Sequence, residues 1–489
     1  MLDFLIKHSS SISLTFVLLL AVFTVVRIIR DTNNSSKTLA YILLVFLLPV
    51  AGSIIYFAFG VNYRRRKMFS KKILANEALF ERIEGRLLEQ SRLVLKEQHA
   101  NIAGADNLAN LLMNDARAPL SYSKVELLTN GEQKFPEVIS ALKAATKFIH
   151  IEYYIFDYDE IGKEIIAVLK ERVAAGVTVR FIYDDFGSHQ INDDILAELR
   201  EAGILAFPFY EVKFFLLANR LNYRNHRKII IVDGNIGFTG GINVSDRYIN
   251  RGLHEELYWR DTHIKITGPA VNSLQYHFIA NWNFCSEQML KLEPEYFTKI
   301  TEPSVEAEDL VQIVAGGPDY PSSSVMLSFF TAIVSARQRI FITSPYFIPN
   351  ESICDALKTA ALSGKDVRLL LPGISDSKIV NAAARSYFQE MLLSGVKIYL
   401  YQKGFVHAKT MVVDDNIAIV GTANMDARSF DLNFEINAIV YSKRVCAELT
   451  ELFLKDLEDS DETTLEEWNE RKWWQELRDD VARLLSPLL

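Results

Sequence analysis

The sequence predicts an α/β fold in which one layered unit occurs twice, preceded by a pair of apolar helices. Three observations predict this fold. A polar motif is written twice at a fixed offset, short apolar runs alternate with helical patterns from Ser123 onward, and the apolar runs of the first half recur in the second. With 489 residues the chain is also too long for one ordinary hydrophobic core. We therefore expect a duplicated domain.

Residues 1–70 are predicted to form a membrane anchor. Two apolar runs stand out there, and helices of about 11–30 and 39–59 would be long enough to cross a bilayer. A cleaved signal peptide is the alternative for the first run, but Arg27 and Arg30 close that run without a small-residue cleavage site. A second apolar run also follows at once, so we predict a transmembrane helical hairpin.

A basic cluster follows the second apolar run and consists of Arg64, Arg65, Arg66, Lys67, Lys71 and Lys72. The end of a membrane segment that carries more lysine and arginine normally stays in the cytoplasm. We therefore expect the large C-terminal part of the chain to be cytoplasmic. The cluster is either a topology signal alone or also a contact for anionic lipid headgroups. Residues 71–122 then show apolar residues at helical spacing, which predicts a helical connector.

The repeated motif is H-x-K-x4-D, and a glycine and an asparagine follow it in both copies. Its members are His226, Lys228, Asp233, Gly240 and Asn243 in the first copy, and His407, Lys409, Asp414, Gly421 and Asn424 in the second. The offset between the copies is 181 at all five positions. One such match is weak, whereas two matches with matching tails indicate a duplicated site. We expect the copies to lie in two repeats, residues 123–300 and residues 301–489, the second ending in a helix.

These residue types suit the transfer of a phosphoryl group. A histidine and a lysine two residues apart share one face of an extended strand. Two such strands brought together would place two imidazoles, two ammonium groups and two carboxamides around one point. Lysine and asparagine N–H groups neutralise and orient phosphate oxygens, while one histidine attacks phosphorus and the other protonates the leaving oxygen. Histidine fits both roles because its pKa lies near neutrality. This chemistry requires no metal and no other cofactor.

Composition argues against several other classes of protein. The formal charge of −8 disfavours nucleic acid as the main partner. The three cysteines, Cys285, Cys354 and Cys446, are odd in number and unclustered, so neither a disulfide framework nor a zinc site is expected.

The paired motifs resemble those of the phospholipase D superfamily, and the surrounding residues look more narrowly like bacterial cardiolipin synthases. The narrower likeness rests on Arg224-Asn-His-Arg-Lys-Ile229, Phe238-Thr-Gly-Gly-Ile-Asn243, Trp259-Arg-Asp-Thr-His263, Gly421-Thr-Ala-Asn-Met-Asp-Ala-Arg-Ser-Phe430 and the chain end from Leu484 to Leu489. It implies two layered α/β/α domains with pseudo-twofold symmetry, in a multi-pass protein of the bacterial inner membrane. The partners implied are phosphatidylglycerol and other membrane lipids, without a cofactor.

The resemblance also implies site residues. The expected catalytic set is His226, Lys228, Asp233, His407, Lys409 and Asp414, of which the two aspartates organise a turn rather than touch phosphate. Phosphate contacts are expected from Asn243, Asn424, Gly241 and Thr422. The family often has serine where this chain has Gly241 and Thr422, so Gly241 can offer only its backbone N–H.

An acidic residue after each motif is expected to hold a histidine in the right tautomer. In the superfamily this acid serves the histidine of the opposite half. The resemblance therefore pairs Glu435 with His226, and Asp261 with His407.

The function implied is the transfer of a phosphatidyl group between two phosphatidylglycerol molecules, which gives cardiolipin and glycerol. His226 would attack phosphorus and form a phosphatidyl-histidine, and His407 would act as acid and then as base. The motifs alone leave the acceptor open. A phospholipase D hydrolase, another phosphatidyl transferase, or an inactive membrane-anchored scaffold remain as alternatives.

Overall fold

The computed structural model describes residues 9–31, 35–57, 77–97, 104–209, 223–250, 257–298 and 308–484. The chain forms two compact units, one of Met1–Lys71 with Val212–Tyr223, and one of Lys72–Glu211 with Arg224–Leu489. The predicted basic cluster after the second apolar run lies outside the described residues.

Among its described residues, the smaller unit contains α2 (Ser9–Asp31), α3 (Ser35–Leu47) and α4 (Pro49–Ile55). The second predicted helix, 39–59, is therefore two helices, because a proline cannot donate the helical hydrogen bond and its ring opposes a continuous helix. Thr24 of α2 donates a hydrogen bond to the Ser53 hydroxyl of α4 at 3.0 Å, which ties the two helices together.

No helix in the described ranges combines the length with the apolar character that a membrane crossing needs. The predicted pair of transmembrane helices is therefore not confirmed. The last turn of α2 contains Arg30 and Asp31, and the second apolar run is divided at Pro49.

The predicted connector contains helices α5 (Glu77–Glu97) and α6 (Asp106–Asp115). Leu108, Ala109 and Leu112 of α6 are fully buried in the hydrophobic core of the second half of the large unit. A segment that precedes the first half in sequence thus completes the core of the second half.

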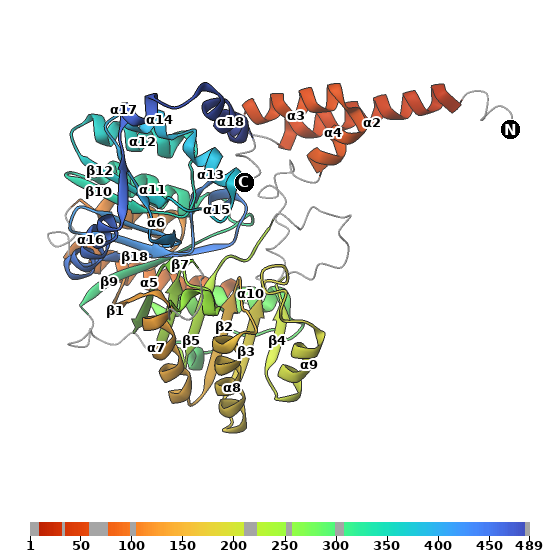
Figure 1. Cartoon of the computed structure of the whole chain (residues 1–489). Helices are drawn as coiled ribbons and strands as arrows, with labels where there is room; N and C mark the ends of the chain where they lie inside the picture. Colours follow the sequence, from red (N-terminus) through yellow and green to blue (C-terminus); the bar gives the residue numbers. More distant parts are fainter. Residues whose placement is uncertain are drawn as a thin grey trace. The chain divides into compact units, whose positions relative to one another are not determined.

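Within the described residues, the large unit is built on one 15-stranded sheet, whose strands Figure 1 shows between layers of helices. The strands of the first half are β1 (Ser121–Thr129), β2 (Phe148–Tyr153), β3 (Thr178–Tyr183), β4 (Leu205–Pro208), β5 (Lys228–Val232), β6 (Ile236–Gly240) and β8 (Thr262–Thr267). Those of the second half are β9 (Asp309–Gly316), β10 (Arg339–Thr343), β12 (Asp366–Pro372), β13 (Lys397–Tyr401), β15 (Thr410–Val413), β16 (Ile417–Gly421), β18 (Glu435–Tyr441) and β19 (Ser460–Thr463).

The strand order is β19-β13-β12-β10-β15-β16-β18-β9-β1-β8-β6-β5-β2-β3-β4. The two halves meet where β1 pairs antiparallel with β9, with Tyr122 opposite Leu310. Counted outward from that pair, both halves have the same order. The next strand begins at the acid or directly after it, the two strands of the motif hairpin follow, and then come three strands that run parallel to one another. The predicted α/β fold is confirmed.

Helices connect the strands and pack on the sheet (Figure 1). The first half contains α7 (Asn130–Ala144), α8 (Glu160–Ala174), α9 (Asp193–Glu201), the short η5 (Asp246–Tyr248), α10 (Val271–Cys285) and η6 (Pro294–Tyr296). The second contains α11 (Ser324–Ser335), α12 (Glu351–Leu362), α13 (Lys378–Arg385), α14 (Phe388–Leu393), α15 (Ala427–Asp431), α16 (Lys443–Glu458), α17 (Leu465–Asn469) and α18 (Trp473–Arg483).

In the part of the chain that the structure describes, two short strand pairs lie outside the main sheet. One is β11 (Phe347–Ile348) with β17 (Met425–Asp426), and the other is β14 (Gly404–Val406) with β7 (Tyr258–Arg260). The second pair joins the halves, because β7 precedes the acid of the first half and β14 precedes the histidine of the second.

Candidate active site

The two motif copies lie at the start of equivalent hairpins. Lys228 begins β5, and Lys409 immediately precedes β15. The backbone N–H of His226 donates to Phe434 O at 3.0 Å, and that of His407 donates to Arg260 O at 2.7 Å. Each histidine is therefore fixed by the residue that precedes the acid of the opposite half.

Each imidazole also meets the acid of the opposite half. His226 Nδ1 lies 3.0 Å from Glu435 Oε2, and His407 Nδ1 lies 2.7 Å from Asp261 Oδ2. Both carboxylates are completely buried. Because Nδ1–H donates to a carboxylate, Nε2 keeps its lone pair, which is the state that a nucleophile or a base needs. The structure thus makes both crossed pairs that we expected from the resemblance.

Burial lowers the pKa of both histidines. For His407, burial and the neighbouring Lys409 lower the pKa to about 3 although Asp261 acts in the opposite direction. For His226, burial again has the largest effect and lowers the pKa, with Glu435 opposing it. Both imidazoles are therefore neutral near neutral pH.

The two lysines are fully buried and lie near each other. Lys228 Nζ donates to His226 O at 2.8 Å, and Lys409 Nζ donates to His407 O at 2.5 Å. Burial, helped by Lys409, lowers the pKa of Lys228 to about 7, and burial lowers that of Lys409 to about 8. A phosphate anion between the two ammonium groups would raise both pKa values again, because its negative charge stabilises the protonated lysines. The pair is thus prepared to bind an anion.

The two asparagines differ in their contacts. Asn243 Nδ2 donates to Tyr248 OH at 2.8 Å, and Asn243 Oδ1 accepts from the backbone of Ile155 at 3.3 Å. The Asn424 Oδ1 atom is buried and has no hydrogen-bond donor among the described residues. Both polar atoms of the Asn243 side chain thus form hydrogen bonds within the described part of the protein, whereas the side-chain oxygen of Asn424 does not.

Gly241 and Thr422 lie beside the acids, which corrects their predicted role as phosphate contacts. Gly241 N donates to Thr262 O at 2.9 Å, so this N–H is already used. The Thr422 hydroxyl donates to Glu435 Oε2 at 2.5 Å. Both positions support an acid instead, because the larger Glu435 receives a hydroxyl and Asp261 occupies the space beside a glycine.

Asp233 and Asp414 face away from the imidazoles and hold turns, as we expected. Both have positive φ, 51° in each case. Asp233 accepts backbone N–H bonds from Thr146, Lys147 and Phe148 at 2.8–2.9 Å. Asp414 accepts equivalent bonds at 2.8–3.0 Å from Arg337, Gln338 and Arg339. These carboxylates have no geometry for contact with phosphate.

Comparison with known proteins agrees with this geometry. The family model described as "Cardiolipin synthase, PLD-like domain" matches residues 138–281 and 329–457, which together exceed half of the chain. The cardiolipin synthase of Halalkalibacterium halodurans is 41% identical over 470 residues, covering 96% of this chain and 92% of that protein.

The chain belongs to the cardiolipin synthase family of phospholipase D-like enzymes.

Other comparisons extend this result. The major cardiolipin synthase ClsA of Bacillus subtilis is 38% identical over 487 residues, covering 98% of this chain and 99% of that protein. A model described as "Phospholipase_D-nuclease N-terminal" matches residues 19–60. Among solved structures, phosphatidylserine synthase of Haemophilus influenzae shares the fold, with a TM-score of 0.59, 16% identity and coverage of 78% of this chain and 100% of that chain.

The sequence analysis missed the aromatic residues around the histidines. The Tyr154 ring lies 4.9 Å from the His226 ring, and the rings of Trp259 and Phe405 lie 5.5 and 5.7 Å from that of His407. Tyr248 OH lies 3.5 Å from His407 Nδ1. Aromatic residues in and beside strands are usually core residues, so only the spacing of Phe405, two residues before the histidine, offered a signal.

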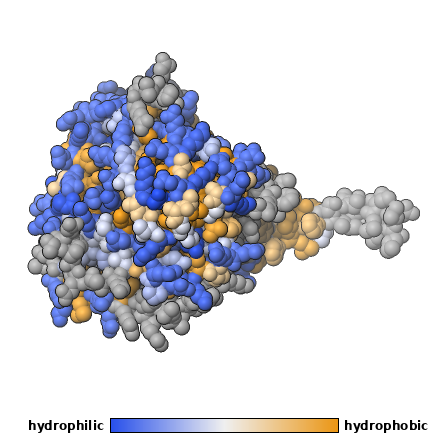
Figure 2. Space-filling model, turned by 90° about the horizontal axis from the view of Figure 1, so that it is seen from below, coloured by the Kyte–Doolittle hydropathy of each residue, from blue (hydrophilic) through white to orange (hydrophobic). Residues whose placement is uncertain are grey.

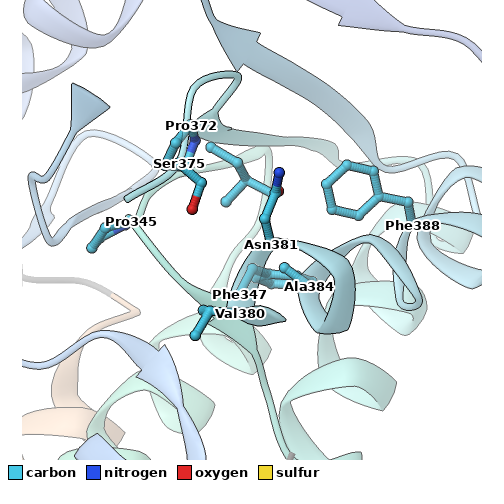
Figure 3. A pocket seen from close by; sticks show the side chains of 9 residues that line it. Pro345, Phe347, Pro372, Ser375, Val380, Asn381, Ala384 and Phe388 are labelled. Atoms are coloured by element: carbon cyan, nitrogen blue, oxygen red, sulfur yellow. The ribbon is translucent and has the colours of Figure 1, made fainter. Parts of the chain in front are cut away.

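A small apolar pocket lies elsewhere in the second half, between the ends of β11 and β12 and helix α13 (Figure 3). Its volume is about 10 Å³, enough for one water molecule but not for an acyl chain. No motif residue lines it. Within the described residues, no three histidine, cysteine, aspartate or glutamate side chains are grouped as metal ligands.

Proposed function

We propose that this chain is a cardiolipin synthase that transfers the phosphatidyl group of one phosphatidylglycerol to a hydroxyl of another, releasing glycerol. One observation carries the proposal: two neutral imidazoles from opposite halves are each held at Nδ1 by a buried carboxylate, beside two buried lysines. This arrangement provides a nucleophile, a general acid and a cationic site for phosphate.

In the first step, His226 Nε2 attacks phosphorus. The bond from phosphorus to the glycerol headgroup oxygen breaks, and His407 gives that oxygen a proton. We assign the attack to His226, as the resemblance implies. The phosphate of the substrate offsets the charges of Lys228 and Lys409, which raises the pKa of His407 above its low value and favours its role as acid.

In the second step, His407 takes the proton from a hydroxyl of the second phosphatidylglycerol. The resulting oxygen attacks phosphorus, the bond from phosphorus to His226 Nε2 breaks, and cardiolipin forms. Glu435 and Asp261 stabilise the imidazolium that each histidine passes through.

The two halves are copies of one unit related by a pseudo-twofold axis. The matching strand order on both sides of the β1–β9 pair, the reciprocal pairs of histidine and acid, and two separate matches to one family model support this inference.

The smaller unit attaches the enzyme to the membrane. Its helices expose large apolar side chains, including Phe16, Leu19, Phe46 and Leu47, which are between 64% and 81% exposed. Figure 2 shows the visible surface of these helices as hydrophobic, whereas much of the large unit's surface in that view is hydrophilic. An exposed apolar surface of this kind favours contact with lipid. The multi-pass location with a cytoplasmic catalytic domain stays a prediction.

Hydrolysis by water and transfer to another alcohol are the alternative reactions. The test incubates purified protein with phosphatidylglycerol in detergent micelles and follows the products by mass. Cardiolipin with an equal amount of glycerol supports the proposal, phosphatidic acid with glycerol indicates a hydrolase, and no turnover indicates a scaffold. His226→Ala and His407→Ala are each expected to abolish cardiolipin formation.

A further inference from the structure

The two flanks of the site differ in charge, although the histidines and lysines are arranged alike. Arg224, His226 and Lys228 alternate along an extended segment, so their side chains share one face. The intervening residues point the other way: Asn225 Nδ2 donates to Glu152 at 2.7 Å, and Arg227 Nη2 donates to Gly316 O at 3.2 Å. The Arg224 side chain therefore lies on the site's face.

The equivalent position in the second half is Phe405, whose ring packs 5.7 Å from that of His407. The face beside His226 thus carries a guanidinium where the face beside His407 carries an apolar ring. Arg224 is only 8% exposed and lies 4.2 Å above the Phe186 ring. Within the part of the chain that the structure describes, no carboxylate forms an ion pair with Arg224.

Arg428 lies on the same flank. Phe434 N donates to Arg224 O at 2.9 Å, and the preceding residue, Asn433, donates from its N–H to Arg428 O at 2.8 Å. Both arginines act on the Tyr154 hydroxyl, where they oppose the rise that burial causes in its pKa. Two guanidinium groups therefore stand near Tyr154, whose ring contacts His226.

Arg247 is the counterpart of Arg428, because each follows its motif asparagine by four residues. Arg247 forms an ion pair in the first half: its Nη2 lies 3.2 Å from Asp157 Oδ2, and its Nε donates to Ser245 at 3.1 Å. The arginine of the first half is thus neutralised by an acid of its own half.

The proposed reaction brings two phosphate groups to the site, and the groups described so far bind only one of them. The lysines and Asn424 serve the reacting phosphate, but the acceptor, a second phosphatidylglycerol, brings a phosphate of its own. Burying that charge without a cation is costly. In the acceptor lipid, a flexible glycerol group of three carbons separates this phosphate from the hydroxyl that attacks. The acceptor phosphate can therefore bind beside the reacting phosphorus.

We propose that Arg224 and Arg428 form a second phosphate subsite that binds the phosphate of the acceptor lipid. This inference rests on the proposed function and extends it: the pair selects an anionic lipid as acceptor over water or a neutral alcohol. Guanidinium is suited to this task because it binds phosphate oxygens in a bidentate manner.

The test compares two reactions of one donor. The first is cardiolipin formation from phosphatidylglycerol, which needs both phosphate sites. The second is exchange of the phosphatidylglycerol headgroup with isotopically labelled free glycerol, which needs only the site at the histidines. For Arg224→Gln and Arg428→Gln, we expect cardiolipin formation to fall about 10-fold or more relative to exchange, as for the loss of a charged hydrogen bond.

Arg247→Gln is the matched control, and its ratio of cardiolipin formation to exchange should equal that of the wild type. Arg224→Lys, which keeps the charge, should recover part of the ratio. Equal losses of both reactions, or no loss of either, would overturn the subsite. A wild-type enzyme that exchanges glycerol but forms no cardiolipin would refute the proposed function, and the subsite with it. The wild type alone gives this result, so it is distinguished from a failure of the subsite, which only the variants can show.

Discussion

Asp261 and Glu435 differ by one methylene group, and the residues around them are adjusted to that difference. A Cβ atom at Gly241 would lie 2.1 Å from Asp261 Oδ1, so only glycine leaves room for the carboxylate that holds His407. At the equivalent place, Thr422 donates its hydroxyl to Glu435. Each half therefore reaches the same contact with a different pair of residues.

Gly241→Ala should displace Asp261 and weaken its hold on His407. We expect kcat to fall about 10-fold or more with little change in KM, because the loss affects a charge that develops in the transition state. Steady-state kinetics in micelles measure both constants. Thr422→Ser keeps its hydroxyl and should stay within about threefold of the wild type. A Gly241→Ala variant with normal kcat would contradict the packing argument.

The pH dependence of substrate binding should follow the two lysines. Their pKa values, about 7 for Lys228 and about 8 for Lys409, mean that both lysines are increasingly neutral as pH rises through this range. A phosphate anion binds the protonated forms more tightly, so KM should rise between about pH 7 and about pH 9. Initial rates across this range test the prediction, and a KM that stays constant there would refute it.

Among the elements, the hairpins β5–β6 and β15–β16 carry the chemistry at one end and a turn at the other. Asp233 and Asp414 have backbone angles in the left-handed region at those turns, and each accepts hydrogen bonds from the N–H groups at the start of a neighbouring strand, β2 for Asp233 and β10 for Asp414. The turns therefore fix each motif strand against its neighbour in the sheet. The aspartate of each motif thus holds the strand, and the strand presents the histidine.

Asp233→Ala removes the acceptor for three backbone N–H groups. We expect a loss of about 2–4 kcal/mol in the free energy of unfolding, because several partly buried donors lose their partner and alanine is disfavoured at positive φ. Unfolding in denaturant measures this loss in the free energy of unfolding. Asp233→Asn should cost less, since asparagine tolerates this conformation and keeps one acceptor oxygen. Activity per folded molecule should change little, and a large loss in kcat with normal stability would assign Asp233 to the chemistry.

Across the whole of the large unit, neither half is a complete enzyme. The acid for each histidine comes from the other half, β7 pairs with β14 across the boundary, and the sheet is continuous through β1 and β9. The single chain therefore builds one site from two motifs. This design differs from an enzyme with two independent centres.

Mixing the His226→Ala protein with the His407→Ala protein should give no cardiolipin, because each site needs both imidazoles from one chain. Product analysis of the equimolar mixture tests this. A wild-type protein diluted with either variant is the control and should lose activity only in proportion to its dilution. Recovered activity in the mixture of variants would mean that motifs from different chains can assemble one site.

The motif pairs, the α/β class and the family could all be predicted from the sequence, because repeated polar residues at a fixed offset and alternating apolar runs are local patterns. Which residues surround and support the pairs of histidine and acid became visible only in the folded chain. Its packing places Thr422 and Gly241 behind the acids instead of at the phosphate, and divides the second apolar run at Pro49. It also gives one flank Arg224 and the other Phe405. His226 and Glu435 lie 209 positions apart in the chain, so their contact depends on how the halves pack, and it could be predicted only through the family resemblance because no local pattern encodes it.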